Sequence, residues 1–234
     1  MARRKGPQAQ HAYEFIKKRI QNFELAPGAP VSDHALEQEL NMSRSPIREA
    51  IMRLSADGLV ELTGTGAQVS GLTLKDIIEI CQVRRALEVA AVEILMENGG
   101  LSEQQKEELT TCYRNLTTTT DIERNYYYDD LFHDMIVNMS GNQRLVAISN
   151  QMRAQMHRAR WLNSVLPNRR AESDQEHVDI YRSLIGNDAQ ASVEAIANHL
   201  DRSEENFRTV LSTGSALPAR IMAIIPGIIG GQAQ

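Results

Sequence analysis

Four side chains in the second half of the chain are of the types that bind a divalent transition metal. Asp129 and His133 are four residues apart, so a helix would place both on one face. Two more histidines, His177 and His199, fall in later helical segments. One carboxylate and three imidazoles suit such an ion and leave room for water or a ligand. The hypothesis requires three helices to converge, because a lone helix histidine is more often a surface residue or a hydrogen-bonded core residue.

Two arginines in the first part of the chain suggest a second kind of chemistry. Arg44 and Arg48 lie at the start of a predicted helix, one turn apart and on nearly the same face. Two guanidinium groups at the N-terminal end of a helix are suited to reading guanine edges in the major groove of DNA. The alternative is an ordinary solvated basic face, so the interpretation depends on the neighbouring segments.

The segments around these arginines form a pattern of their own. A helix is predicted to begin after Ser43, whose hydroxyl would cap a first-turn amide, and to end at Gly58. Ser32–Leu40 predicts a shorter helix before it, joined by a tight turn. Short helix, turn and longer helix is the helix-turn-helix pattern. Val60–Leu62 and Gln68–Ser70 flank the glycine-rich TGTGA and are predicted to form a β-hairpin wing.

The remainder of the chain is predicted to be helical. Apolar residues recur at helical spacing from Leu74 onward, and no strand pattern is found. The predicted helices are Leu74–Glu97, Ser102–Leu116, Asp121–Ser140, Asn142–Leu162, Glu172–Ile185 and Ala189–Leu211. The predicted fold class is therefore mainly α, with an N-terminal winged helix-turn-helix and a C-terminal antiparallel α-helical bundle. The expected domains are 1–72 (winged helix-turn-helix), 73–213 (bundle) and 214–234 (a tail for which the sequence suggests no mechanism).

Composition limits the class of protein. Hydrophobic residues make up 42% of the 234 residues, which is enough for a buried core. Two cysteines do not form a disulfide framework and favour a reducing cytoplasm. We find no apolar segment typical of a signal peptide and no apolar run long enough to span a bilayer. We therefore expect a cytoplasmic protein that does not associate with a membrane.

The net charge of −5 is unusual for a DNA-binding protein, but the charge is unevenly distributed. Residues 1–70 contain 9 Lys/Arg and 8 Asp/Glu, whereas residues 71–234 contain 16 and 22. The acidity belongs to the predicted bundle, and the predicted head is nearly neutral with clustered arginines. Such a head can still bind DNA, and a dimer would double its phosphate contacts.

The N-terminal segments resemble the winged helix-turn-helix of the GntR superfamily of bacterial transcription regulators. The resemblance covers Ala12 to about Ser70 and is carried by LAPGAPVSDHALEQEL, MSRSPIREAIMRLSADGLVEL and GTGAQV. It implies that the two arginines contact guanines, that the neighbouring serines contact phosphate or base edges, and that the wing approaches the DNA backbone. The expected DNA-binding residues are Ser43, Arg44, Ser45, Arg48 and Gly66. The chain departs from the pattern at His34, where many relatives carry a basic or acidic residue.

The second half resembles the effector domain, of FCD type, in the FadR branch of this superfamily. The segments YYYDDLFHDMIVNMSGNQRL and QEHVDIYRSLIGNDAQASVEAIANHL carry the resemblance. In metal-binding members the matching residues ligate an ion, commonly zinc or nickel. The matching residues in this chain are Asp129, His133, His177 and His199. Asp130 is not chosen, because it precedes His133 by three residues and the motif has four.

The resemblance also implies an effector, typically a small carboxylate of central metabolism held near the metal. A cation and an arginine would give a carboxylate two electrostatic anchors in a partly dry cavity. Arg84 matches a recurring arginine of the first bundle helix, and Arg153 is a second candidate on the fourth. The alternative for each is a surface arginine paired with a glutamate, such as Glu88 for Arg84.

Three functions follow from these features. The leading hypothesis is a ligand-responsive regulator, not an enzyme, that binds a short inverted repeat in double-stranded DNA as a homodimer. Repression is the commoner behaviour of the family, and a small organic acid would shift the dimer to a state that no longer matches its operator. The second is a dedicated metal sensor. The third is a metal-dependent hydrolase, for which the sequence shows no separate general base and no nucleophile elbow.

Overall fold

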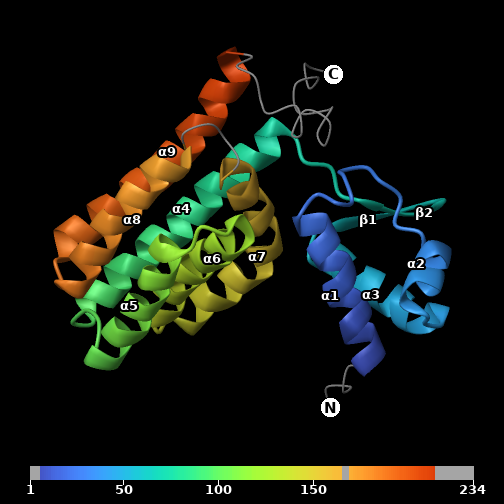
Figure 1. Cartoon of the computed structure of the whole chain (residues 1–234), viewed down its shortest axis with the longest axis horizontal. Helices are drawn as coiled ribbons and strands as arrows, with labels where there is room; N and C mark the ends of the chain where they lie inside the picture. Colours follow the sequence, from blue (N-terminus) through green and yellow to red (C-terminus); the bar gives the residue numbers. More distant parts are fainter. Residues whose placement is uncertain (1–5, 165–168, 214–234) are drawn as a thin grey trace. The chain divides into compact units, whose positions relative to one another are not determined.

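The computed structural model describes residues 6–164 and 169–213, and within these ranges it contains nine helices and one two-stranded sheet (Figure 1). The chain divides into two compact units that meet in sequence between Thr73 and Leu74. The predicted fold class is confirmed, because a winged helix-turn-helix is followed by an antiparallel helical bundle. The predicted tail, residues 214–234, lies outside the described residues.

The first unit contains the helix-turn-helix and its wing. Its elements are α1 (Pro7–Gln21), α2 (Asp33–Leu40), α3 (Arg44–Ala56), β1 (Val60–Thr63) and β2 (Gly66–Val69). α1 packs against α3, and the core of this unit includes the completely buried Ile16, Ile47 and Leu54. β1 and β2 are antiparallel, with Val60 opposite Val69. Both predicted strands therefore form, with bounds that differ from the predicted ones by about one or two residues.

The helices α2 and α3 are capped differently. Ser32 accepts a hydrogen bond from the backbone N–H of Ala35 at 3.2 Å, which satisfies one amide of the first turn. Ser43 occupies the equivalent position before α3, but its hydroxyl makes no such bond, so this part of the prediction was wrong. The third residue of α3 is Pro46, which has no N–H to donate. The exposed Ser43 is therefore not engaged by its own helix.

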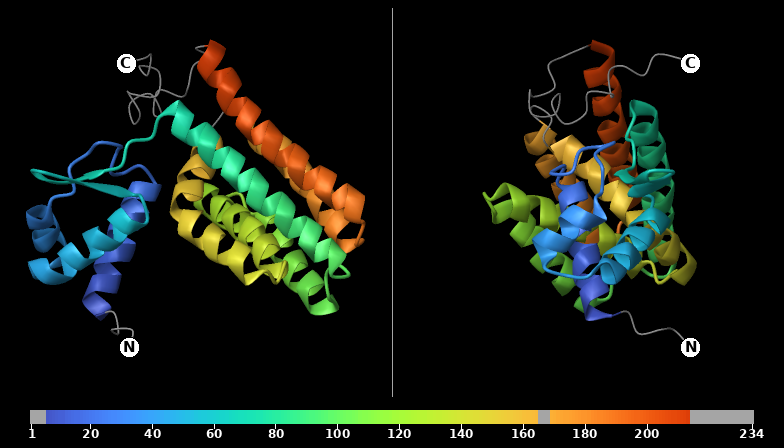
Figure 2. Two further views of the ribbon diagram at one scale, coloured as in Figure 1. Left: turned by 180° about the vertical axis from the view of Figure 1, so that it is seen from behind. Right: turned by 90° about the vertical axis from the view of Figure 1, so that its right-hand side faces the viewer.

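The second unit is a bundle of six helices within the described residues (Figure 2). They are α4 (Leu74–Glu97), α5 (Glu103–Thr118), α6 (Ile122–Met139), α7 (Gln143–Ser164), α8 (Arg169–Ile185) and α9 (Ala189–Thr213). α4 runs alongside α9 and also packs against α6 and α7, so it is the central helix. The interior is apolar and includes Val92, Leu109, Phe132, Ile180 and Ile196. Across the residues that the structure describes, no helix combines the length and hydrophobicity needed to cross a membrane.

Four bundle helices are longer than predicted. α5, α7 and α9 each continue two residues past their predicted ends at Leu116, Leu162 and Leu211, and α8 begins at Arg169 instead of Glu172. Arg169 is buried, and its guanidinium donates two hydrogen bonds, of 2.9 and 2.6 Å, to the carboxylate of Glu176 two helical turns later. This contact within α8 favours the extra residues at the start of that helix.

The loop between α4 and α5 provides a test of backbone conformation. Gly99 and Gly100 both have positive φ, +96° and +80°. A Cβ on Gly100 would lie 2.4 Å from Oδ1 of Asn187, and this oxygen accepts the N–H of Leu101 at 2.9 Å. A Cβ on Gly99 would meet no atom within 4 Å.

We expect Gly100→Ala to lower the free energy of unfolding by about 1 kcal/mol more than Gly99→Ala. Both alanines impose the strain of positive φ, of the order of 1 kcal/mol, but only the first displaces Asn187 from its hydrogen bond. Chemical denaturation of the two variants measures the difference. Equal losses would show that Asn187 moves aside without cost.

Candidate metal centre and DNA-binding helix

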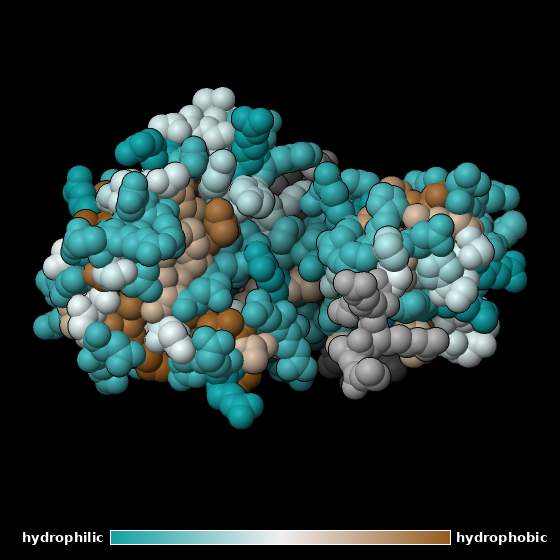
Figure 3. All heavy atoms as spheres, turned by 90° about the horizontal axis from the view of Figure 1, so that it is seen from below, coloured by the Kyte–Doolittle hydropathy of each residue, from teal (hydrophilic) through white to brown (hydrophobic). Residues whose placement is uncertain are grey.

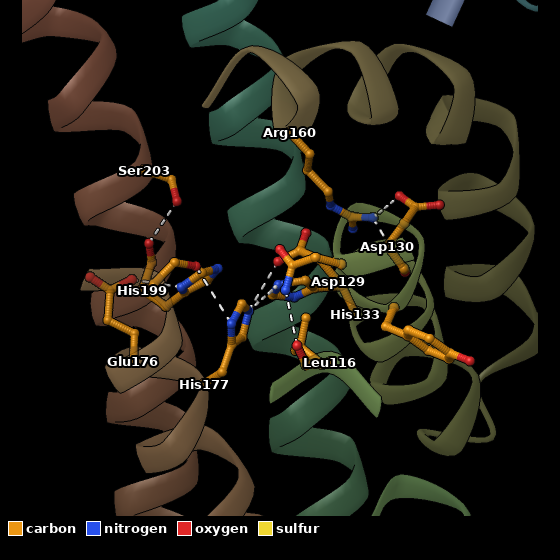
Figure 4. A network of polar contacts seen from close by, with 12 residues as sticks. Leu116, Asp129, Asp130, His133, Arg160, Glu176, His177, His199 and Ser203 are labelled. Atoms are coloured by element: carbon orange, nitrogen blue, oxygen red, sulfur yellow. Dashed lines mark hydrogen bonds and ion pairs between the residues drawn. The ribbon is translucent and has the colours of Figure 1, made fainter. Parts of the chain in front are cut away.

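Three buried histidines from three helices meet inside the bundle (Figure 4). His133 lies on α6, His177 on α8 and His199 on α9, and one ring nitrogen of each lies within 4.8 Å of the others. The Nε2 atoms of His133 and His177 are 3.2 Å apart. The rings of His133 and His199 stack with their centroids 4.9 Å apart. The convergence that a metal site requires is therefore present.

Apolar residues fix the helix faces that carry these histidines. Each histidine has a completely buried isoleucine three positions away on its own helix, and hence on the same face. These residues are Ile136 on α6, Ile180 on α8 and Ile196 on α9. Burying the three isoleucines in one core turns the three imidazoles toward a common centre.

Two glutamates hold the outer nitrogens of the imidazoles. Nδ1 of His133 is 2.7 Å from Oε2 of Glu88, and Nδ1 of His199 is 2.8 Å from Oε2 of Glu176. A carboxylate at Nδ1 fixes the proton there and leaves Nε2 as the ligand atom. For His177, Nδ1 faces the hydroxyl of Ser173 at 3.5 Å. All three rings are thus oriented by a second layer of polar groups, as metal-binding histidines are.

Burial keeps these imidazoles neutral. It lowers the pKa of His133 to about 3, although Glu88 acts in the opposite direction. Burial also lowers the pKa of His177 and moves that of His199 well below its ordinary value. The neutral imidazole is the form that binds a metal.

The spacing of the ligand atoms also suits a metal. Two nitrogens bound to one tetrahedral zinc ion at about 2.0–2.1 Å lie about 3.3 Å from each other, close to the 3.2 Å between His133 and His177. The donor set therefore fits a divalent transition metal.

The two neighbouring aspartates of α6 have different surroundings. Oδ1 of Asp129 is 3.3 Å from Nε2 of His177, at the edge of the histidine cluster. Asp130 instead forms an ion pair with Arg160 of α7 and hydrogen-bonds to it (Figure 4). Asp129 is therefore placed to act as a fourth ligand, and Asp130 is not.

Two buried arginines share one carboxylate beside the histidines. Nε of Arg84 and Nη2 of Arg160 donate to the same oxygen of Glu88, at 2.7 and 3.1 Å. Burial alone would raise the pKa of Glu88, but Arg84, His133 and Arg160 hold it well below its ordinary value. Glu88 is therefore ionised. The alternative for Arg84 was a surface pair with Glu88; the pair exists, but it is buried.

The same arginines retain unused donors. Among the described residues, Nη2 of Arg84 and Nε of Arg160 are buried and make no hydrogen bond. Buried donors of this kind cost free energy unless an acceptor reaches them. An anionic group entering next to the histidines would supply that acceptor.

Arg153, the other predicted effector residue, lies at the periphery. Its side chain is 44% exposed, and its guanidinium pairs with Asp134 and lies 3.8 Å from Asp130. Arg160, seven residues later and on the same helix face, takes the buried position that was expected for Arg153. Sequence reasoning missed Arg160, although the seven-residue spacing was a usable signal. It also missed Glu88 and Glu176 as partners of the histidines, for which the sequence offers no local signal.

The expected DNA-binding residues are exposed in the first unit. Ser43, Arg44, Ser45 and Arg48 all lie at or next to the start of α3, and Gly66 begins the second strand of the wing. Arg44 and Arg48 each pair with an acidic residue of α2. The tip of α3 is therefore accessible to a ligand from outside.

Comparison with known proteins identifies a family match for each of the two units. Residues 8–69 match the bacterial regulatory proteins of the gntR family, and residues 79–202 match the FCD domain. The chain belongs to the GntR family. This GntR-family protein is 30% identical to the uncharacterized HTH-type transcriptional regulator YdhC of Bacillus subtilis, over 86% of this chain and 92% of that one. It is 23% identical to the HTH-type transcriptional repressor RspR of Escherichia coli, over 89% of this chain and 92% of the repressor.

A solved structure shows the same fold for the GntR-family chain as a whole. E. coli McbR/YncC superposes with a TM-score of 0.73 at 22% identity, covering 87% of this chain and 98% of that one. The predicted family is thus confirmed, and the relatives named above are transcriptional regulators. Family membership supports a regulator of transcription rather than an enzyme.

Proposed function

We propose that this GntR-family protein is a ligand-responsive repressor of the FadR branch, which binds a short inverted repeat as a homodimer and releases it when a small organic acid binds in the bundle. One observation carries the sensing half: three converging imidazoles lie beside buried arginine donors that have no hydrogen-bond partner among the described residues. The exposed start of α3 supports the DNA-binding part of the proposal. The DNA-binding residues are Ser43, Arg44, Ser45, Arg48 and Gly66.

The metal ligands in this proposal are Asp129, His133, His177 and His199, with zinc or nickel as the ion. Glu88 and Glu176 hold the imidazoles in the ligating tautomer. A bound ion would supply positive charge in a site that burial has made poor in water, and an acid could bind it if the ion accepts a ligand beyond these four. Direct contacts with the glutamates hold two of the imidazoles, which limits the ordering that binding would require.

The effector is a small carboxylate held by the metal and by Arg84. Its carboxylate would satisfy Nη2 of Arg84, and a second acceptor would reach Nε of Arg160. Arg160 replaces Arg153 as the second arginine in this proposal, because Arg153 is half exposed and already paired with Asp134. Binding acts on DNA only if the acid has different affinities for the DNA-bound and released arrangements of the dimer.

The release of DNA by candidate acids tests the sensing proposal. A duplex is first selected from a random library by the wild-type protein, and organic acids are then screened for release of that duplex. We expect Arg84→Lys to require at least about 10-fold more acid, because lysine keeps the charge and loses the Nη2 donor. Binding of the duplex without acid should be unchanged.

Arg153→Ala is the matched control, since it removes a guanidinium that is half exposed and already paired at the edge of the same site. It should shift the release curve by less than about 3-fold. Equal shifts in Arg84→Lys and Arg153→Ala, or no shift in Arg84→Lys, would contradict the assignment of Arg84.

The homodimer is proposed to form through the bundle. Figure 3 shows hydrophobic side chains at the surface of the bundle among hydrophilic ones. Val83 of α4 and Ile148 of α7, 38% and 49% exposed, belong to two helices that pack against each other. A contact with a second copy would remove these two side chains from water. Sedimentation at micromolar concentration tests the state of the full chain.

A dedicated metal sensor is the second candidate. In that case a chelator alone would release the selected duplex, and no organic acid would be needed. The burial of all three histidines favours an ion that is held permanently, because exchange would require the bundle to open.

A further inference from the structure

Two acidic residues of α2 contact the two arginines at the tip of α3. Nε of Arg44 donates to Oε2 of Glu37 at 3.0 Å, and Nε of Arg48 lies 3.4 Å from Oδ2 of Asp33. The acids are four residues apart on α2 and the arginines are four residues apart on α3. Each helix therefore presents a matched pair to the other, which one accidental contact would not produce.

Both contacts lie at Nε, as a hydrogen bond in Arg44 and as an ion pair without a hydrogen bond in Arg48. In both arginines the carboxylate faces Nε, and no hydrogen bond of the Nη groups is found among the described residues. An arginine has five N–H donors in a rigid planar fork. A contact at Nε leaves the two Nη groups of each exposed arginine available, and together they can bind N7 and O6 of a guanine.

Acidic residues at this position lower the electrostatic attraction between the tip of α3 and DNA phosphates. Asp33 and Glu37 offset the charges of Arg48 and Arg44, so the tip attracts phosphate less than two free arginines would. Both arginines are exposed, and exposed ion pairs contribute little to folding stability. Stability therefore does not explain why acidic residues stand at this position.

We propose that Glu37 and Asp33 are positioning residues for sequence reading: a hydrogen bond from Arg44 and an ion pair with Arg48 engage Nε of each arginine and so leave the Nη groups to contact guanine. The inference rests on the proposed function, because it assumes that α3 reads DNA. The acids lower the affinity for phosphate of any sequence and restrict the arginines to one orientation. Together these two effects raise the ratio of specific to non-specific binding.

The test uses the full chain and three duplexes. The first is the duplex selected from a random library by the wild-type protein, the second carries 7-deazaguanine in place of the guanines of each half-site, and the third has a random sequence. Fluorescence anisotropy gives the Kd of each at several salt concentrations. The wild type should discriminate against 7-deazaguanine by about 10-fold or more, since that base lacks the N7 acceptor.

Glu37→Gln should reduce this discrimination by at least about 3-fold, while the random duplex is bound more tightly and with a steeper dependence on salt. Glu37→Asp keeps the charge and shortens the side chain. It should reduce discrimination without tightening binding to the random duplex, which separates positioning from simple charge removal. Asp33→Asn should act in the same way through Arg48.

Glu39→Gln is the matched control. Glu39 lies on the same helix and bears the same charge, but it binds Arg19 of α1 at 2.7 Å and not an arginine of α3. It should leave the discrimination unchanged. If the wild type does not distinguish 7-deazaguanine from guanine, guanine reading itself fails. If the wild type does distinguish them and Glu37→Gln does so equally well, the positioning role is refuted and the proposed function stands.

Discussion

Replacement of His199 by alanine is expected to weaken metal binding by more than about 100-fold, so that dialysed protein loses an ion that the wild type keeps. The imidazole of His199 faces the other two histidines and is held by Glu176, so alanine removes one ligand and leaves Glu176 with its arginines alone. Metal analysis after dialysis measures the ion content, and competition with a chelating dye measures the affinity.

Thermal melting gives a second readout that does not depend on DNA. An ion present at about 1,000 times its Kd stabilises the folded state by roughly 4 kcal/mol. For a chain of this size that corresponds to a rise in Tm of roughly 8–16 °C. Chelator should remove this rise from the wild type and have little effect on His199→Ala.

His157→Ala is the control for loss of a histidine from the same bundle. His157 lies on α7, packs edge-on against the ring of Tyr126 and does not belong to the histidine cluster. Its replacement should leave the ion content and the chelator effect unchanged. If His199→Ala retains as much metal as His157→Ala, the three histidines are not a metal site.

The outline of the fold could be predicted because its signals are local. α4 runs from Leu74 to Glu97 as expected, since apolar residues recur at helical spacing up to the glycines at 99 and 100. The start of α8 could not be predicted in the same way. The prediction began α8 at Glu172, which the structure places in the first turn; Arg169 carries a positive charge, which is unfavourable at a helix N-terminus, and its two hydrogen bonds to Glu176 favour its place there.

The sequence predicted the metal-binding residues of the candidate site but not the side chains that hydrogen-bond to them. Aspartate and histidines at motif spacing indicated the ligands, but nothing in the sequence places Glu88 against His133, 45 residues away. The contact between Arg160 and Glu88 spans 72 residues. Such partners depend on which helix faces meet, and three-dimensional packing decides that. The expected capping bond of Ser43 is absent; the proline three residues later removes one of the two amides that such a cap can bind, and the amide of Ser45 remains.

Arg48→Ala should weaken binding to the selected duplex by at least about 30-fold, because one bidentate contact with guanine is worth about 1–3 kcal/mol and the proposed homodimer would lose two. Arg48 is exposed at the start of α3 and packs into no core, so the variant should fold like the wild type. Binding to a random duplex should weaken much less, since only one phosphate attraction is lost per chain.

Lys106→Ala on α5 removes the same charge from the other unit, where Lys106 pairs with Glu103, and should change neither affinity. If both duplexes lose affinity equally, Arg48 contacts only phosphate. If binding to the selected duplex is unchanged, the tip of α3 does not contact DNA.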